Sequence, residues 1–452
     1  MDQNNENQKQ SAKVNLSSKQ AEEATPPAWW WVERSVWTEA MLTRLTSKEP
    51  ANRVWYTLVD KTYNPANLQS AYEKVKRNGG SAGVDGQTLS QFERRAPEEL
   101  RWLVEQLRRG SYRPQPVRRT WIDKPGSTDK RPLGIPVVRD RIVQGALRQV
   151  LEPIFETEFA EQSYGFRPGR GAKDALRRVD QLLKAGYCQV VDADLKSYFD
   201  TIPQERLLAL VQQRVADGRV LRLVEGFLRA GVMEESKGWK PTNQGTPQGG
   251  VISPLLANIY LNGLDHQMAL EGFEMIRYAD DFVVLCRNPA QAQEALSKIR
   301  QWVTEAGLTL HPEKTRLVDA NQPGGFDFLG YHFERGQRWP RKKSLSKLKD
   351  RVKQQTQRRD GRALQQIVQS LNRTLRGWYA YFQHSQKATF PQVDGFVRRR
   401  LRSLLEKRRG RTRQGIGRAH QRWPNAWFAQ MGLVSLEAEH NWTRTIVRLR
   451  TH

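Results

Sequence analysis

The sequence predicts an α+β protein, in which a body of helices and antiparallel strands is followed by a basic helical end. Residues 190–200 and 277–286 are apolar, β-branched runs interrupted by acids, which is typical of buried strands with polar ends. Residues 139–160 repeat apolar side chains every three or four positions, as an amphipathic helix does. After Pro340, long amphipathic segments with basic faces predict helices.

The two acidic strands carry the candidate functional side chains. Asp280 and Asp281 occupy the turn between two apolar runs, and the two-residue period of a strand puts Asp192 and Asp194 on one face. Neighbouring carboxylates repel each other, so a nearby cation favours their ionised form, and hard oxygen ligands favour Mg²⁺. Each pattern also has a simpler interpretation: a solvent-facing turn for the first pair and a salt-bridged strand edge for the second.

Three segments in this order resemble the palm of a reverse transcriptase: Asp194 followed by Phe199, the loop 244–254, and the turn 278–281. The spacing from Asp194 to Phe199 favours Asp194 over Asp192 as the metal ligand. Further segments resemble the narrower family of bacterial group II intron-encoded reverse transcriptases and maturases. They are residues 79–86, 131–136, 163–169, 326–331 and 375–378. The resemblance covers about residues 50–440.

The resemblance implies a right-hand polymerase with fingers and palm made of an antiparallel sheet and helices, then an α-helical thumb and a small basic C-terminal domain. It implies an RNA-directed DNA polymerase in which Asp194, Asp280 and Asp281 bind two Mg²⁺ ions. The backbone carbonyl of Leu195 is expected to join the metal shell. The primer 3′-hydroxyl would then attack the α-phosphorus of a dNTP, and pyrophosphate would leave.

A nucleotide-binding set follows from the same resemblance. Residues 117–135 predict a β-hairpin, and in the family a Lys and an Arg on this hairpin contact the triphosphate, positions that Lys124 and Arg131 match. A solvated basic hairpin is the alternative. Phe199 matches an aromatic residue beneath the sugar that would exclude a 2′-hydroxyl, and it could also be a core side chain. Gln248 matches a glutamine of the substrate-pocket loop.

The predicted nucleic-acid contacts are basic. Residues 163–171 resemble the family's template-holding segment, in which Arg167 and Arg170 could bind nucleic acid or could be structural. Lys314 matches a family lysine at the palm. The helices after Pro340 combine cationic faces with aromatic residues, as proteins that bind the phosphate backbone do. The contacts predicted there are Arg376, Arg399 and Arg408.

The charge of the chain points to a polyanionic partner. The formal net charge is +26, and the basic residues gather at the end, where residues 341–452 hold 27 Lys and Arg against 6 Asp and Glu. The resemblance implies that these partners are group II intron RNA, template RNA, primer or target DNA, and dNTPs. It also implies that one chain both polymerises and assists splicing and intron mobility.

The cysteines and the hydropathy predict a cytoplasmic protein without a membrane partner, and the resemblance implies that it is bacterial. Only Cys188 and Cys286 are present, both in apolar runs, which indicates free buried thiols and a reducing compartment. No apolar stretch reaches the length of a membrane span, and the first 25 residues lack the core of a signal peptide.

The chain divides into five predicted segments. They are a disordered leader at 1–26, a helical extension at 27–100, fingers and palm at 101–338, a helical thumb or maturase segment at 339–400, and a basic RNA- or DNA-binding domain at 401–452. Helices are predicted at 29–45, 65–76, 139–160, 206–228, 255–264 and 290–306. Ser253 and Pro254 are the expected N-cap and first residue of their helix, and residues 326–333 are an expected hairpin strand.

The resemblance leaves two functional alternatives open. One is a splicing-only maturase that binds RNA without polymerising, which the intact acids and the intact Gln248 loop argue against. The other is a reverse transcriptase recruited to host DNA repair or phage defence. Many family members also carry a cysteine-containing HNH endonuclease domain. No Cys follows Cys286, so we expect this chain to lack that domain and not to cleave the second target strand.

Overall fold

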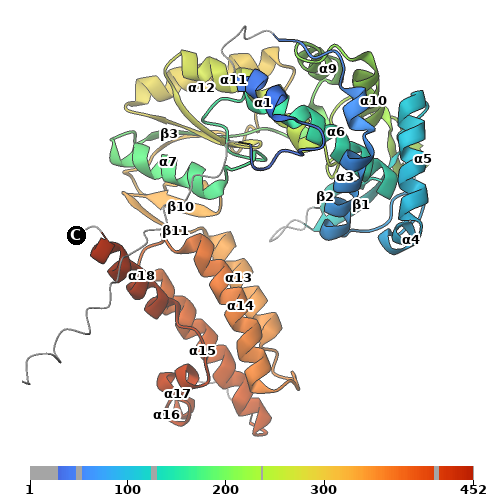
Figure 1. Cartoon of the computed structure of the whole chain (residues 1–452). Helices are drawn as coiled ribbons and strands as arrows, with labels where there is room; N and C mark the ends of the chain where they lie inside the picture. The colour runs from blue at the N-terminus through green and yellow to red at the C-terminus, as the bar shows by residue number, and fades with distance from the viewer. Residues whose placement is uncertain (1–28, 47–52, 124–129, 236–237, 412–416, 451–452) are drawn as a thin grey trace, which may run out of the picture.

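The computed structural model describes residues 29–46, 53–123, 130–235, 238–411 and 417–450 (Figure 1). A body of sheets and helices forms its upper part, and a group of helices extends below it. The predicted leader at 1–26 and Lys124 lie outside the described residues. Within those residues, no helix combines the length and the apolar character needed to cross a membrane.

The central sheet has the order β6-β7-β3-β8, and its neighbouring strands are antiparallel. These strands are β6 (Glu274–Tyr278), β7 (Asp281–Cys286), β3 (Gln189–Asp194) and β8 (Arg316–Asp319). Both faces of the sheet are covered, which explains why β7 is continuously apolar after Asp281 and why the apolar residues of β3 face both sides. Val191 and Ala193 pack with the helices α11 (Ser253–Leu270) and α12 (Pro289–Glu305), whereas Val190 packs with α7 (Ala172–Lys184).

A second sheet, in the order β2-β1-β4-β5, forms the fingers. Its strands are β1 (Val117–Asp123), β2 (Lys130–Ile135), β4 (Val232–Glu234) and β5 (Gly238–Lys240). The antiparallel hairpin of β1 and β2 confirms the prediction for residues 117–135, whereas β4 and β5 were not predicted. Five helices pack on one another before and after the first two strands of this sheet. They are α2 (Val59–Thr62), α3 (Pro65–Asn78), α4 (Leu89–Arg94), α5 (Ala96–Arg109) and α6 (Val138–Glu156).

The lower part is helical and begins after a three-stranded sheet. The strands of this sheet are β9 (Phe326–Phe328), β10 (Tyr331–Glu334) and β11 (Gln337–Pro340). The expected hairpin strand at 326–333 is therefore two paired strands, β9 and β10. The helices that follow are α13 (Lys342–Gln355), α14 (Leu364–Phe382), α15 (Thr389–Arg408), α16 (Arg418–Arg422), α17 (Asn425–Gln430) and α18 (Leu436–Arg450). The α+β fold class, with a helical thumb after fingers and palm, is confirmed.

Two predicted domain boundaries fall inside helices. Position 400 lies in the middle of α15, and residues from Leu348 to Leu436 share one hydrophobic cluster. The C-terminal segment therefore packs together with the thumb, in one core. Position 100 lies inside α5, whose buried Leu103 and Leu107 belong to the same core as the N-terminal helices.

Three predictions about helices need correction. The predicted helix at 29–45 begins only at α1 (Glu39–Thr46), because Trp37 is buried in a turn with its indole Nε1 donating to the Gln149 carbonyl at 3.1 Å. The predicted helix at 206–228 is two helices, α9 (Gln204–Gln212) and α10 (Gly218–Arg229). Ser253 is not the N-cap of α11, since Ile252 holds that position and the Ser253 hydroxyl donates to the Pro247 carbonyl at 2.9 Å.

The break between α9 and α10 is made by Asp217, which joins α10 to the N-terminal extension. One carboxylate oxygen accepts from the backbone amides of Arg219 and Val220 at 3.0 and 3.2 Å, which caps α10. The other oxygen accepts from the amides of Leu58 and Val59, both at 2.8 Å. Burial would raise the pKa of Asp217, but the four amide hydrogen bonds outweigh it and lower that pKa.

We therefore expect Asp217→Asn to lower the free energy of unfolding by about 2–3 kcal/mol at pH 7, because an amide has one acceptor oxygen where the carboxylate has two. A lowered pKa stabilises the folded state above the unfolded-state pKa of about 4, and this contribution is lost as the pH falls through the folded-state pKa. The difference between the wild type and the variant should thus begin to shrink only below about pH 4.

Urea unfolding at several pH values measures both effects. Asp60→Asn, an exposed acid in the nearby helix α2, is the matched control and should change stability by less than about 0.5 kcal/mol. Equal losses in the two variants would contradict the role given to Asp217.

Candidate active site

The register of the central sheet brings the acidic strand ends together. Asp194, the last residue of β3, pairs directly with Asp281, the first residue of β7. Tyr278 at the end of β6 also pairs with Asp281, so Ala279 and Asp280 form the turn between the two strands. Asp194, Asp280 and Asp281 therefore lie together at one end of the two central strands, although Asp194 is far from the other two in the sequence. We call this end of the sheet the acidic edge.

The acids at this edge repel one another. Burial, followed by the charges of Asp192, Asp280 and Asp194, raises the pKa of Asp281 to about 7. Burial also raises the pKa of Asp280, and the charge of Asp194 adds to this effect. Carboxylate oxygens with uncompensated negative charge are a donor set that fits a hard divalent cation such as Mg²⁺.

Two basic side chains pair with the acids of β3: Lys314, just before β8, and Arg316, the first residue of β8. Lys314 forms a hydrogen-bonded ion pair with the carboxylate of Asp194, and Arg316 Nε donates to Asp192 at 3.0 Å. Among the described residues, no three His, Cys, Asp or Glu side chains already form a metal-binding group. Ion binding at this edge would therefore have to compete with Lys314 for Asp194.

A cavity of about 600 Å³ lies between the fingers sheet and the loop 241–248. Phe199 and Gln248, both predicted nucleotide contacts, line it. Gln248 Nε2 donates to Asp200 at 3.3 Å, while the Gln248 carbonyl accepts from the Gly134 amide of β2 at 2.6 Å. The structure thus brings Phe199 and Gln248 to one cavity.

The predicted arginine of the hairpin does not line this cavity. Pro132 and Gly134 of β2 do, so Arg131 lies on the opposite face by strand alternation. Its positive charge nevertheless lowers the pKa of Asp280, opposing the larger effect of burial. Arg131 is therefore electrostatically linked to the acidic edge rather than to the cavity wall.

Sequence reasoning missed three charged residues that line the cavity, Arg119, Asp200 and Glu234. Arg119 of β1 and Asp200 both line it, and burial raises the pKa of Asp200 while the charge of Arg119 opposes that rise. Strand alternation with Val117 and Trp121, which also line the cavity, could have indicated the orientation of Arg119. The sequence held no comparable signal for Asp200.

The arginines of the predicted template-holding segment are bound within the protein. The Arg167 side chain is 3% exposed, and its guanidinium donates to Glu156 at 2.7 Å and to the Ala160 carbonyl at 2.6 Å. This favours the structural alternative for Arg167 over nucleic-acid binding. Arg170 is half-buried and donates to the carbonyl of Glu161.

The three arginines predicted to contact nucleic acid from the thumb are exposed. Arg376 lies on α14, and Arg399 and Arg408 lie on α15. The Arg399 guanidinium is 5.7 Å from the centre of the Phe396 ring, and Arg408 donates to the Asp360 carbonyl at 3.2 Å. Each therefore keeps its charge at the protein surface.

Comparison with known proteins gives two family matches and several relatives. Residues 122–333 match the reverse transcriptase (RNA-dependent DNA polymerase) family, and residues 345–423 match the group II intron maturase-specific domain. Protein YkfC of Escherichia coli is 36% identical over 292 residues, which cover 56% of this chain and 76% of that protein. The group II intron-encoded protein LtrA of Lactococcus lactis is 38% identical over 232 residues, which cover 50% of this chain and 38% of LtrA.

The chain thus matches less than half the length of LtrA. Among solved structures, a partial Cas6-RT-Cas1--Cas2 complex has 26% sequence identity and a TM-score of 0.36, covering 55% of this chain and 41% of that chain. The two family matches follow one another along the sequence, the first over fingers and palm and the second over the thumb. The chain belongs to the family of group II intron-encoded reverse transcriptases and maturases.

Proposed function

We propose that this chain is an RNA-directed DNA polymerase whose active site is the edge of the central sheet formed by Asp194, Asp280 and Asp281. The pairing of Asp194 with Asp281, inside the segment that matches the reverse transcriptase family, is the observation that supports it most. The three carboxylates, with the carbonyl of Leu195, would hold two Mg²⁺ ions. When bound, such ions lower the pKa of the primer 3′-hydroxyl and neutralise charge on the phosphates.

The remaining residues of the site would bind and orient the nucleotide. Phe199 would lie beneath the deoxyribose, with Gln248 beside it on the cavity wall. Arg131 and Lys124 would bind the triphosphate, since a planar guanidinium group suits phosphate oxygens. Lys314, paired with Asp194 in this structure, would be released towards nucleic acid when the acids bind metal.

We further propose that the basic helical part binds group II intron RNA and so assists splicing and mobility. The match to the maturase-specific domain covers α13 to α16, and Arg376, Arg399 and Arg408 are exposed on it. Template RNA and primer or target DNA would share this surface. A splicing-only maturase would bind RNA equally well but would not extend a primer.

Asp281→Asn should abolish cDNA synthesis on a primed RNA, with a loss of more than about 1000-fold, because several kcal/mol of transition-state stabilisation depend on the metal ligands. Primer-extension rates at saturating Mg²⁺ and dNTP measure this. The control is Asp319→Asn in β8, at the opposite end of the same sheet, where the amide oxygen can still accept from the Asn321 backbone. Retained synthesis by Asp281→Asn would reject the metal-ligand assignment.

Phe199→Val should lower the discrimination against ribonucleotides by about 10–100-fold, because the smaller side chain leaves room for a 2′-hydroxyl. The ratio of kcat/KM for dNTP to kcat/KM for rNTP measures the effect, and Phe199→Tyr, which keeps the bulk of the ring, is the control. An unchanged ratio in Phe199→Val would identify Phe199 as a core side chain only.

Replacing Arg376, Arg399 and Arg408 together by Gln should weaken RNA binding and reduce the slope of log K against log salt by about one for each phosphate that the protein no longer neutralises. Filter binding of group II intron RNA at several salt concentrations measures the slope. The control removes the same charge from exposed arginines of α4 and α5, by Gln at Arg94, Arg101 and Arg109. Equal slope changes in both triple variants would show that net charge, not this surface, determines binding.

A further inference from the structure

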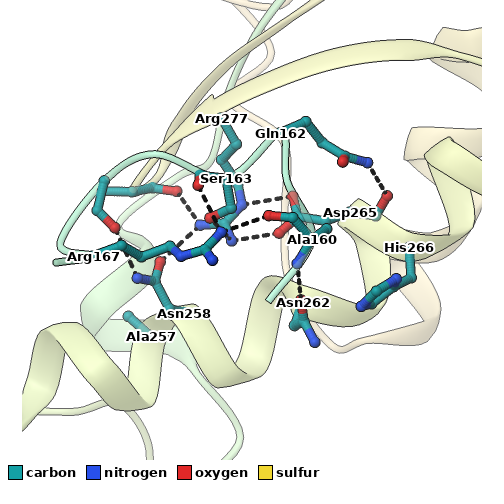
Figure 2. A network of polar contacts seen from close by, with 12 residues as sticks. Ala160, Gln162, Ser163, Arg167, Ala257, Asn258, Asn262, Asp265, His266 and Arg277 are labelled. Atoms are coloured by element: carbon teal, nitrogen blue, oxygen red, sulfur yellow. Dashed lines mark hydrogen bonds and ion pairs between the residues drawn. The ribbon is translucent and has the colours of Figure 1, made fainter. Parts of the chain in front are cut away.

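Arg277, on β6 two residues before the turn of Ala279 and Asp280, is a fully buried charged side chain at the centre of a polar network (Figure 2). Its partner Asp265 on α11 is equally buried, at 0% exposure for both side chains. Arg277 Nε donates to one Asp265 oxygen at 2.7 Å, and Nη2 donates to the other. Because apolar residues of similar size often replace buried ion pairs without loss of stability, stability alone is a weak explanation for this pair.

The other donors of the guanidinium reach the acidic turn and the neighbouring loop. Nη1 donates to the carbonyl of Ala279 at 2.9 Å and to Asn258 Oδ1 at 3.0 Å, and Nη2 donates to Ser163 Oγ at 2.8 Å. With the two bonds to Asp265, all five N–H groups of the side chain have an acceptor. Only an arginine has five donors in this planar arrangement.

The same network fixes the loop of residues 163–166, which lies against the turn of Ala279 and Asp280. Asn258 Nδ2 donates to the Gly165 carbonyl at 2.8 Å, so Asn258 bridges this loop and Arg277. A Cβ at Gly165 would lie 2.3 Å from the Ala279 nitrogen, which shows how closely the loop and the turn approach. The backbones also bond directly, since the Tyr164 amide donates to the Arg277 carbonyl at 2.9 Å.

Two non-glycine residues held by this network have left-handed backbones. Ala279 has a φ of 61° and Phe166 a φ of 60°. Such conformations are strained for residues with a Cβ and persist where the surroundings fix them. Here the Ala279 carbonyl is held by Arg277, and Phe166 follows the anchored Gly165, with its ring 6.4 Å from that of Tyr278.

We propose that Arg277 is a positioning residue that fixes the Ala279 turn against Asp265, Asn258 and Ser163, and thereby sets the positions of the carboxylates of Asp280 and Asp281. Its side chain is fully buried and acts through the backbone of the turn. This inference rests on the proposed function, because the acids must hold metal ions for their position to matter.

Arg277→Lys is the principal test. Lysine keeps the positive charge beside Asp265 but has three donors from one nitrogen, so it cannot hold the turn, Asn258 and Ser163 together. We expect kcat for primer extension to fall about 100-fold, as for a misplacement of reacting groups by about 1 Å. The Mg²⁺ concentration that gives half of the maximal rate should rise. RNA affinity should stay the same.

Two measurements do not depend on activity. Mn²⁺ binding to the protein without nucleic acid, followed by electron paramagnetic resonance, should weaken in Arg277→Lys. Hydrogen exchange of the peptide containing Ala279, Asp280 and Asp281 should become faster. Ser163→Ala, which removes one hydrogen bond of the network, should show the same changes at smaller size and keeps the test decisive if Arg277→Lys does not fold.

Arg402→Lys is the matched control. Arg402 is also buried, at 2% exposure, but it lies in the thumb and donates to the Trp423 carbonyl at 2.9 Å and to Asn425 at 2.8 Å. It should lower stability without changing Mn²⁺ affinity or exchange at the turn. Unchanged Mn²⁺ affinity and exchange in Ser163→Ala and in folded Arg277→Lys would overturn the proposal, whereas a wild type that binds no Mn²⁺ and extends no primer would overturn the proposed function itself.

Discussion

The antiparallel register between β3 and β7 is the constraint on which the rest of the candidate site depends. It places Asp194 opposite Asp281, and a slip by one residue would turn Asp194 to the other face of the sheet. Both faces enforce this register, because Val190 packs under α7 while Val191 packs under α11 and α12. The position of the acids is thus determined by hydrophobic packing on two sides and not by attraction between the acids themselves.

That packing holds like charges together at some cost. Burial and mutual repulsion raise the pKa of Asp281 to about 7, so without a cation this carboxyl is partly protonated near neutral pH. Lys314 and Arg316 offset part of the negative charge by pairing with Asp194 and Asp192. A bound divalent ion would provide the larger compensation, which is why an electrostatically unfavourable cluster at a rigid sheet edge is suited to metal binding.

Local periodicity predicted much of the fold, and long-range contacts account for the failures. The hairpin of 117–135 follows from a pattern within a few residues. The helix predicted at 206–228 is instead interrupted at Asp217, and two of the four backbone amides that Asp217 accepts from are about 160 positions away in the sequence. Strand alternation restricts the face on which each carboxylate lies, but it does not say which strands pair. The convergence of Asp194 and Asp281 was expected from the resemblance to the palm of a reverse transcriptase. The arginine behind the turn was not, because only the fold shows that the Arg277 guanidinium is buried against an acid on another element.

The joint between fingers and palm links this acidic edge to the nucleotide cavity. The loop that carries Gln248 bonds to β2 through the Gly134 amide, and the Thr246 amide donates to the Phe199 carbonyl at 2.7 Å. A Cβ at Gly249, whose φ is 112°, would lie 2.3 Å from the Gly134 carbonyl, so the approach requires a glycine. Since Phe199 follows β3 by five residues, the strand that positions Asp194 also positions the cavity wall, and a shift of β2 would move Gln248 relative to both.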